Sequence, residues 1–183
     1  MGRAGGDRTG EWTMRWVSFA ILVAVVLVLQ TTLVPRLSIR GIFPDLLLIV
    51  ALYYALQAPE APAMLAGWIC GLMMDLSAGG RVGVLAFAFG LVGVLVVKIR
   101  DLTFRDNPLL QMFVALVAGS IVHGIERGQR VLWGEAAAGM GDALLTGVFV
   151  AMYTAALTPY VHWLLSRARG LLLLPLRTAR TRR

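Results

Sequence analysis

The chain has 183 residues, of which 58% are hydrophobic and only 15% charged. A soluble domain usually carries about a quarter charged residues, so this composition excludes an ordinary soluble protein. Apolar stretches separated by short charged or Gly/Pro-marked breaks make up most of the sequence. This pattern predicts a single all-α, polytopic membrane domain built as a six-transmembrane-helix bundle.

The predicted membrane-spanning helices lie at about residues 16–34, 43–58, 62–77, 82–99, 108–125 and 140–165. The membrane domain then covers residues 16–165, between an N-terminal tail (1–15) and a basic C-terminal tail (166–183). The first span is longer than a signal-peptide core and no small-residue cleavage site follows it, so we expect it to be retained. The second and third spans reach only about 24 Å, which is short for a bilayer core of about 30 Å. We expect Pro159 either to kink the last helix or to end it early.

The distribution of positive charge predicts the orientation. In a six-span topology, twelve Lys and Arg residues fall on the side of the two termini and five fall on the other side. The positive-inside rule therefore predicts that both termini are cytoplasmic. We interpret the arginine-rich C-terminal tail as a topology signal or an attraction to anionic lipid. No nucleic-acid partner is expected, because the sequence offers no aromatic platform or groove-reading motif.

A glycine-spaced stretch ends in a lone acid. Gly67, Gly71 and Asp75 recur every four residues, so they share one stripe of a helix, and the two glycines allow a neighbouring backbone to come close. A carboxylate is costly in hydrocarbon, so we expect Asp75 to lie at the water boundary or to find a partner. A Gly-rich break containing Arg81 follows, and the next apolar run opens at Gly83. This arrangement predicts a helix junction with a polar anchor.

Pro44 and Asp45 precede the second predicted helix. The simpler interpretation is a helix start, with proline in the first turn and an acid at the positive end of the helix dipole. The functional interpretation is that Asp45 and Asp75 belong to a charged outer rim that fixes helix ends or meets an external partner. The basic members of that rim would be Arg36, Arg40 and Arg81.

The remaining polar residues predict no catalytic, cofactor or metal site. His123 has no companion ligands, so we interpret it as a hydrogen-bonded interface residue. We expect Glu126 and Glu135 to be solvated loop charges, and Asp142 to be a helix-start acid. Cys70 is the only cysteine, which excludes an intrachain disulfide and a Cys-based metal site.

Several of these motifs together resemble the rod shape-determining protein MreD family. Pro44-Asp45 and its apolar run, the Gly67-x-x-x-Gly71-x-x-x-Asp75 stretch, the Gly-rich break and Gly83 occur in the order and spacing of that family. The resemblance covers roughly residues 15–167 and implies a non-enzymatic component of the bacterial inner membrane that supports peptidoglycan synthesis and rod cell shape. It also implies a fold similar to the substrate-binding subunits of energy-coupling-factor transporters.

The resemblance further implies direct binding to a bitopic MreC-like protein, and indirect association with MreB, RodA and a class B penicillin-binding protein. No catalytic residues come with the family. The motif positions carry over as partner-binding or structural candidates only: Pro44, Asp45, Gly67, Gly71, Asp75, Arg81 and Gly83.

Three functions remain open at this point. The leading hypothesis is a scaffold that docks a partner's transmembrane helix and outer domain. The second is a small-molecule-binding importer subunit, whose pocket would draw on Asp45, Asp75, His123 and Trp133. The third is a membrane enzyme acting on lipid head groups, for which the sequence supplies no catalytic constellation.

Overall fold

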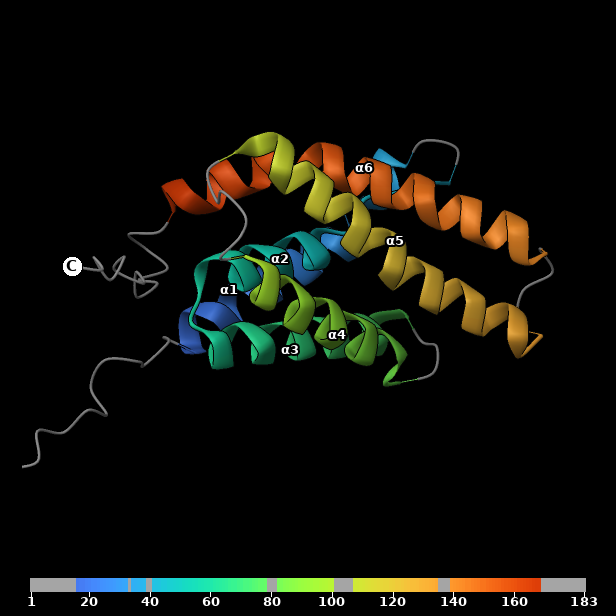
Figure 1. Ribbon diagram of the computed structural model, residues 1–183, viewed down its shortest axis with the longest axis horizontal. Helices are drawn as coiled ribbons and strands as arrows, with labels where there is room; N and C mark the ends of the chain where they lie inside the picture. The colour runs from blue at the N-terminus through green and yellow to red at the C-terminus, as the bar shows by residue number, and fades with distance from the viewer. Residues whose placement is uncertain are drawn as a thin grey trace, which may run out of the picture.

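The computed structural model describes residues 16–32, 34–38, 41–78, 82–100, 107–134 and 139–168. Within these ranges the chain forms six α-helices and one short 3-10 helix, and the all-α prediction is confirmed. Successive α-helices run in opposite directions, so α1 begins and α6 ends at the same end of the bundle (Figure 1). We call this the terminal end and the opposite one the distal end. The elements are α1 (Trp16–Thr32), η2 (Val34–Leu37), α2 (Leu46–Gln57), α3 (Glu60–Ala78), α4 (Val84–Ile99), α5 (Pro108–Leu132) and α6 (Met140–Arg167).

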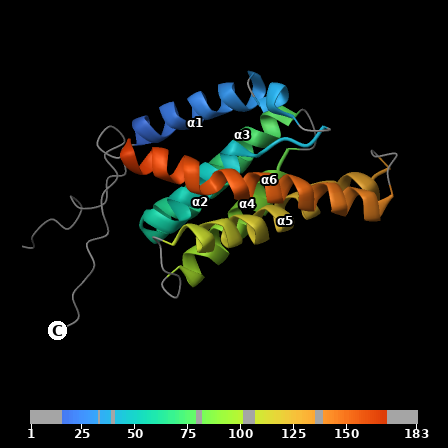
Figure 2. The same cartoon turned by 90° about the horizontal axis from the view of Figure 1, so that it is seen from above.

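Helix α2 occupies the centre of the bundle and packs against each of the other five α-helices (Figure 2). Ten of its residues are buried, from Leu47 to Leu56, and they leave no polar face. At 1.5 Å per residue a helix of 12 residues spans only about 18 Å, less than a bilayer core of about 30 Å. Since protein surrounds α2 on all sides, the backbone groups at both of its ends need partners from other helices.

The outer helices present an apolar surface. On α1, Val17, Ile21 and Val28 are all more than half exposed. Such a surface suits lipid and would promote aggregation in water. Four segments are long and apolar enough to cross a membrane: the stretch Trp16–Arg36 that begins with α1, and helices α3, α5 and α6; α2 and α4 are shorter. The six predicted helices are therefore present in the described part of the chain, although two of them are shorter than a full span.

The third helix is longer than predicted. It begins at Glu60 and has 19 residues. Pro62 therefore does not precede the helix but stands in its first turn. A proline is tolerated there, since the N–H groups of the first turn have no partner within the helix. The prediction that the third span is short is therefore wrong.

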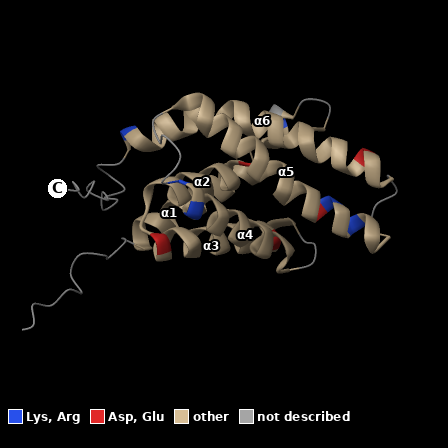
Figure 3. Ribbon diagram, viewed as in Figure 1, with Lys and Arg blue, Asp and Glu red and all other residues tan. Residues whose placement is uncertain are grey.

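Helices α5 and α6 also run further than predicted. Helix α5 continues past residue 125 to Leu132, through a charged segment in which Arg130 and Glu126 form an ion pair at 2.7 Å one turn apart. Helix α6 continues through Pro159 to Arg167. The alternative that Pro159 ends this helix early is therefore wrong. The pair α5–α6 projects beyond α3–α4 at the distal end, and the charges of α5 lie on this projecting half (Figure 3).

Candidate functional site

A buried polar cluster surrounds Asp45, the residue immediately before α2. Oδ1 of Asp45 accepts a hydrogen bond from the backbone N–H of Leu48 at 2.9 Å, as a helix N-cap does. The backbone N–H of Asp45 donates to the hydroxyl of Thr154 on α6 at 3.0 Å. Asp45 is only 1% exposed. The prediction that Asp45 stands at a helix start is confirmed, and this helix start lies inside the protein. Pro44 precedes the cap and is not in the first turn, where we expected it.

Gln30 of α1 holds the same helix start from the other side. Its Nε2 donates to the carbonyl of Pro44 at 3.3 Å, and the N–H of Leu46 donates to its Oε1 at 2.8 Å. The side chain is buried. Gln30 was not among the residues predicted from the sequence, although a single amide near the end of a largely apolar helix is a usable signal for such a contact.

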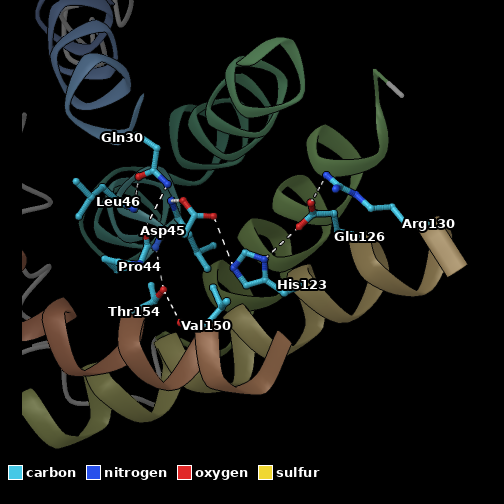
Figure 4. A network of polar contacts seen from close by, with 10 residues as sticks. Gln30, Pro44, Asp45, Leu46, His123, Glu126, Arg130, Val150 and Thr154 are labelled. Atoms are coloured by element: carbon cyan, nitrogen blue, oxygen red, sulfur yellow. Dashed lines mark hydrogen bonds and ion pairs between the residues drawn. The ribbon is translucent and has the colours of Figure 1, made fainter. Parts of the chain in front are cut away.

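A chain of ionisable groups leads from Asp45 towards the surface along α5 (Figure 4). Nε2 of His123 lies 3.8 Å from Oδ2 of Asp45, and its Nδ1 lies 3.3 Å from Oε2 of Glu126. Oε1 of Glu126 in turn accepts a hydrogen bond from Nη2 of Arg130 at 2.7 Å. The prediction that Glu126 is a solvated loop charge is wrong, because this side chain is only 18% exposed and lies between two cationic or ionisable partners on the same helix.

Asp75 forms a second junction, between α3 and α4. Its two carboxylate oxygens accept hydrogen bonds from three backbone N–H groups at the start of α4: Gly83 at 2.8 Å, Leu85 at 3.0 Å and Ala86 at 2.9 Å. Asp75 is 3% exposed. A carboxylate at a helix N-terminus satisfies donors that have no partner within the helix and complements its positive dipole end. The expected polar anchor of a helix junction is confirmed.

Glycines allow α3 and α4 to approach closely along the same stripe. A Cβ atom on Gly71 would lie 2.5 Å from the carbonyl oxygen of Leu85 and 2.7 Å from Cα of Ala86. A Cβ atom on Gly67 would lie 3.1 Å from the carbonyl oxygen of Phe89. The predicted close approach of a neighbouring backbone at both glycines is therefore confirmed, and that neighbour is α4.

The acids do not form the exposed charged rim that we considered. Asp45 and Asp75 are both buried, and each caps a helix start. Gly83 precedes α4 with a φ of 111°, a conformation that favours glycine. Arg81, Arg40 and Glu135 lie outside the described residues. The structural interpretation of these positions has direct support, whereas a role in partner binding remains a proposal.

The opposite end of α2 is held by Arg100, one of the twelve positive residues that the predicted topology places on the side of the termini. Its guanidinium Nη1 donates to the carbonyl of Ala55 at 3.0 Å and also to the carbonyl of Ala58. Arg100 is 2% exposed. A cation here satisfies the last carbonyls of α2 and complements the negative end of its dipole.

The buried polar groups join helices to one another. His162 of α6, which the sequence analysis also overlooked, lies 3.4 Å from the carbonyl of Ile49 on α2 and packs edge-on against the ring of Tyr53. Within the described ranges, no three His, Cys, Asp or Glu side chains come together as metal ligands would. These buried polar side chains hold the starts and ends of helices in place through hydrogen bonds to backbone groups.

An apolar groove runs between α4 and α5 near the terminal end. It is lined by nine side chains, from Val92 to Ile99 on α4 and from Phe113 to Ile121 on α5, and all of them are apolar. Small and branched side chains such as Ala118 and Val114 line it together with the larger Phe113. The groove is a concave apolar surface on a helical bundle whose outer surface suits lipid.

Comparison with known proteins identifies the family. The model of the rod shape-determining protein MreD family matches residues 11–134, about two-thirds of the chain. The chain therefore belongs to this family, and it is a multi-pass membrane protein with a role in rod shape determination. The match covers the Asp45, Asp75 and His123 positions described above. No solved structure matches the chain, so the expected likeness to energy-coupling-factor subunits stays a prediction.

Proposed function

We propose that this protein is a non-enzymatic scaffold of the cell-wall elongation complex in the bacterial inner membrane. In this role it binds an MreC-like bitopic protein directly and, through it, MreB, RodA and a class B penicillin-binding protein. The observation that carries the proposal is the family match over residues 11–134. It is supported by the use of Asp45, Asp75 and Arg100 in holding helix ends, which suits a rigid platform.

The groove between α4 and α5 supports binding of the partner's single transmembrane helix. Helices in lipid gain little from burying apolar surface, so they associate through close packing and shape. A concave surface with Ala118 and Val114 in its lining lets a second helix approach more closely than a face covered by large exposed side chains, such as that of α1 with Val17 and Ile21. We therefore assign the partner helix to this groove.

Recovery of the partner tests this proposal. A tagged copy of the full chain, purified from native membranes, is expected to bring down an MreC-like protein. Val117→Trp fills the groove and is expected to reduce that recovery at least five-fold. The matched control is Val148→Trp on α6, because Val148 is 41% exposed and Val117 is 40% exposed. Equal recovery of the partner with both variants would show that the groove is not the docking site. If the unmodified chain recovered no MreC-like protein, the scaffold proposal itself would be contradicted.

The proposed orientation places both termini in the cytoplasm and the distal end outside. It rests on the excess of Lys and Arg on the side of the termini and on Trp163, which lies 62% exposed near the end of α6 under the guanidinium of Arg167. In a background carrying Cys70→Ala, a membrane-impermeant maleimide should label Leu132→Cys at the distal end of α5 in intact cells. It should label Thr178→Cys in the basic tail only after the cells are opened. Labelling of Thr178→Cys in intact cells would reverse the assignment.

A further inference from the structure

Two buried polar atoms face each other inside the bundle without a hydrogen-bond partner among the described residues. They are Oδ2 of Asp45 and Nε2 of His123, separated by 3.8 Å. The two side chains are only 2% and 6% exposed. A buried carboxylate oxygen and a buried imidazole nitrogen each carry a large cost when unpaired, so their juxtaposition requires an explanation.

The surroundings of Asp45 favour a proton between these atoms. Burial has the largest effect on Asp45, because it penalises the ionised carboxylate; among charged groups, His123 favours the carboxylate and Glu126 repels it. Arg127 and Arg130 act on Glu126. If the imidazole were neutral, an ionised Asp45 would be a buried anion close to another anion. An imidazolium would instead stand between the two carboxylates, with one ring nitrogen directed to each.

The other elements packed around this site supply no competing cation. Helix α1 contributes the neutral amide of Gln30, and α6 contributes the hydroxyl of Thr154. Helix α3 contributes the buried thiol of Cys70, which is close enough to interact electrostatically with Asp45. Helix α2 has no charged residue between 46 and 57. In the described part of the chain, His123 is therefore the ionisable base placed to neutralise Asp45.

We propose that Asp45 and His123 form a proton-binding site that fastens the start of α2 to α5. The bound proton makes the ring of His123 an imidazolium, which donates a hydrogen bond to Glu126 through Nδ1 and forms an ion pair with Asp45 across the 3.8 Å between Nε2 and Oδ2. When the proton leaves, the ring becomes neutral, the ion pair with Asp45 is lost and the two carboxylates repel each other. Glu126, whose side chain is 18% exposed, connects the ring to the surface, and its carboxylate lies where it can accept the proton that the imidazolium releases from Nδ1.

The two histidines of the chain make a direct test practical. The full-length protein, labelled with ¹⁵N-histidine and reconstituted in lipid nanodiscs, is examined by NMR, and His162→Gln assigns the signals. At any one pH in a titration, a larger fraction of His123 rings is expected to carry protons on both nitrogens in the unmodified protein than in Asp45→Asn. Equal doubly protonated fractions in the two proteins throughout the titration would overturn the proposal.

The pH dependence of stability gives a second readout, independent of partner binding. A folded state that holds an extra proton is most stable at low pH and loses stability as the pH rises and the proton leaves. As the pH is raised, the thermal midpoint of the unmodified protein should fall more steeply than that of His123→Gln. Glu60→Gln, which removes an exposed ion pair with Lys98, should keep the slope of the unmodified protein. A slope for His123→Gln equal to that of the unmodified protein would refute a proton site at this residue.

Discussion

Replacing Gly71 with alanine is expected to destabilise the protein by about 3 kcal/mol, at the upper end of the usual cost of overpacking. The added methyl group would lie 2.5 Å from the carbonyl oxygen of Leu85 and between 2.7 and 2.9 Å from backbone atoms of Ala86. These are main-chain atoms of a helix, so they cannot move aside as a flexible side chain can. Helix α4 would have to shift as a whole, and Asp75 would then lose its alignment with the start of that helix.

A matched glycine separates this effect from that of helix propensity. Gly128 lies on α5, and a Cβ atom there would meet only the sulfur of Met140 at 4.0 Å. Gly128→Ala should leave the thermal midpoint unchanged or raise it slightly, since alanine favours helix by up to about 1 kcal/mol. Thermal unfolding in detergent is the measurement, and a loss of about 3 kcal/mol corresponds to roughly 10 °C for a chain of this length. Equal midpoints for the two variants would contradict the close approach of α3 and α4.

The glycine seam could be predicted from the sequence because its signal is local. A spacing of four residues places Gly67, Gly71 and Asp75 on one stripe of a helix whatever that helix packs against. The identity of the partner required the structure, since α4 follows in the chain but nothing in its apolar sequence specifies where it lies. Residue type and spacing therefore predicted which face of α3 makes the contact, and the structure showed that α4 packs against it.

The burial of the two acids could not be predicted from their positions. A carboxylate at the end of an apolar helix is usually placed at the water boundary, because its desolvation is costly. Here the N–H groups at the start of α4 compensate Asp75, and they lie 8 to 11 residues further along the chain. Such donors belong to the backbone, so the sequence does not reveal them. We correctly placed both acids at helix ends, but we were wrong to infer that they lie on an exposed rim.

The predicted location of Glu126 was also wrong, because we expected this charged side chain to lie in a solvated loop, and the burial of Arg100 was not predicted. The apolar pattern of the fifth span ends near residue 125, yet the helix continues because Glu126 pairs with Arg130 one turn later. Arg100 follows α4 and contributes to the count of positive residues on one side of the membrane. Its burial against the end of α2 depends on a contact across more than 40 residues of sequence, which no local pattern encodes.

Replacing Asp75 with alanine is expected to have the largest effect of any single polar substitution in the described part of the chain. It would remove the acceptor of three backbone N–H groups at the start of α4. A buried donor without a partner costs about 1–3 kcal/mol, so the combined loss should reach about 3–5 kcal/mol. The same side chain closes the α3–α4 seam, and we therefore expect the variant to insert into the membrane but to aggregate on extraction.

Comparing Asp75→Asn with Asp75→Ala separates the contribution of the hydrogen bonds of Asp75 from that of its charge. Asp75→Asn keeps one carbonyl oxygen, which can still accept from Gly83 and Ala86, but its NH₂ group would face the N–H of Leu85. Its stability should fall between those of the unmodified protein and Asp75→Ala. Asp142→Ala is the control, because Asp142 also stands in the first turn of a helix but is exposed, and its loss should cost less than about 1 kcal/mol. Size-exclusion profiles and thermal midpoints measured side by side would give this order, and an Asp75→Ala protein as stable as Asp142→Ala would contradict the role of Asp75 as the cap of α4.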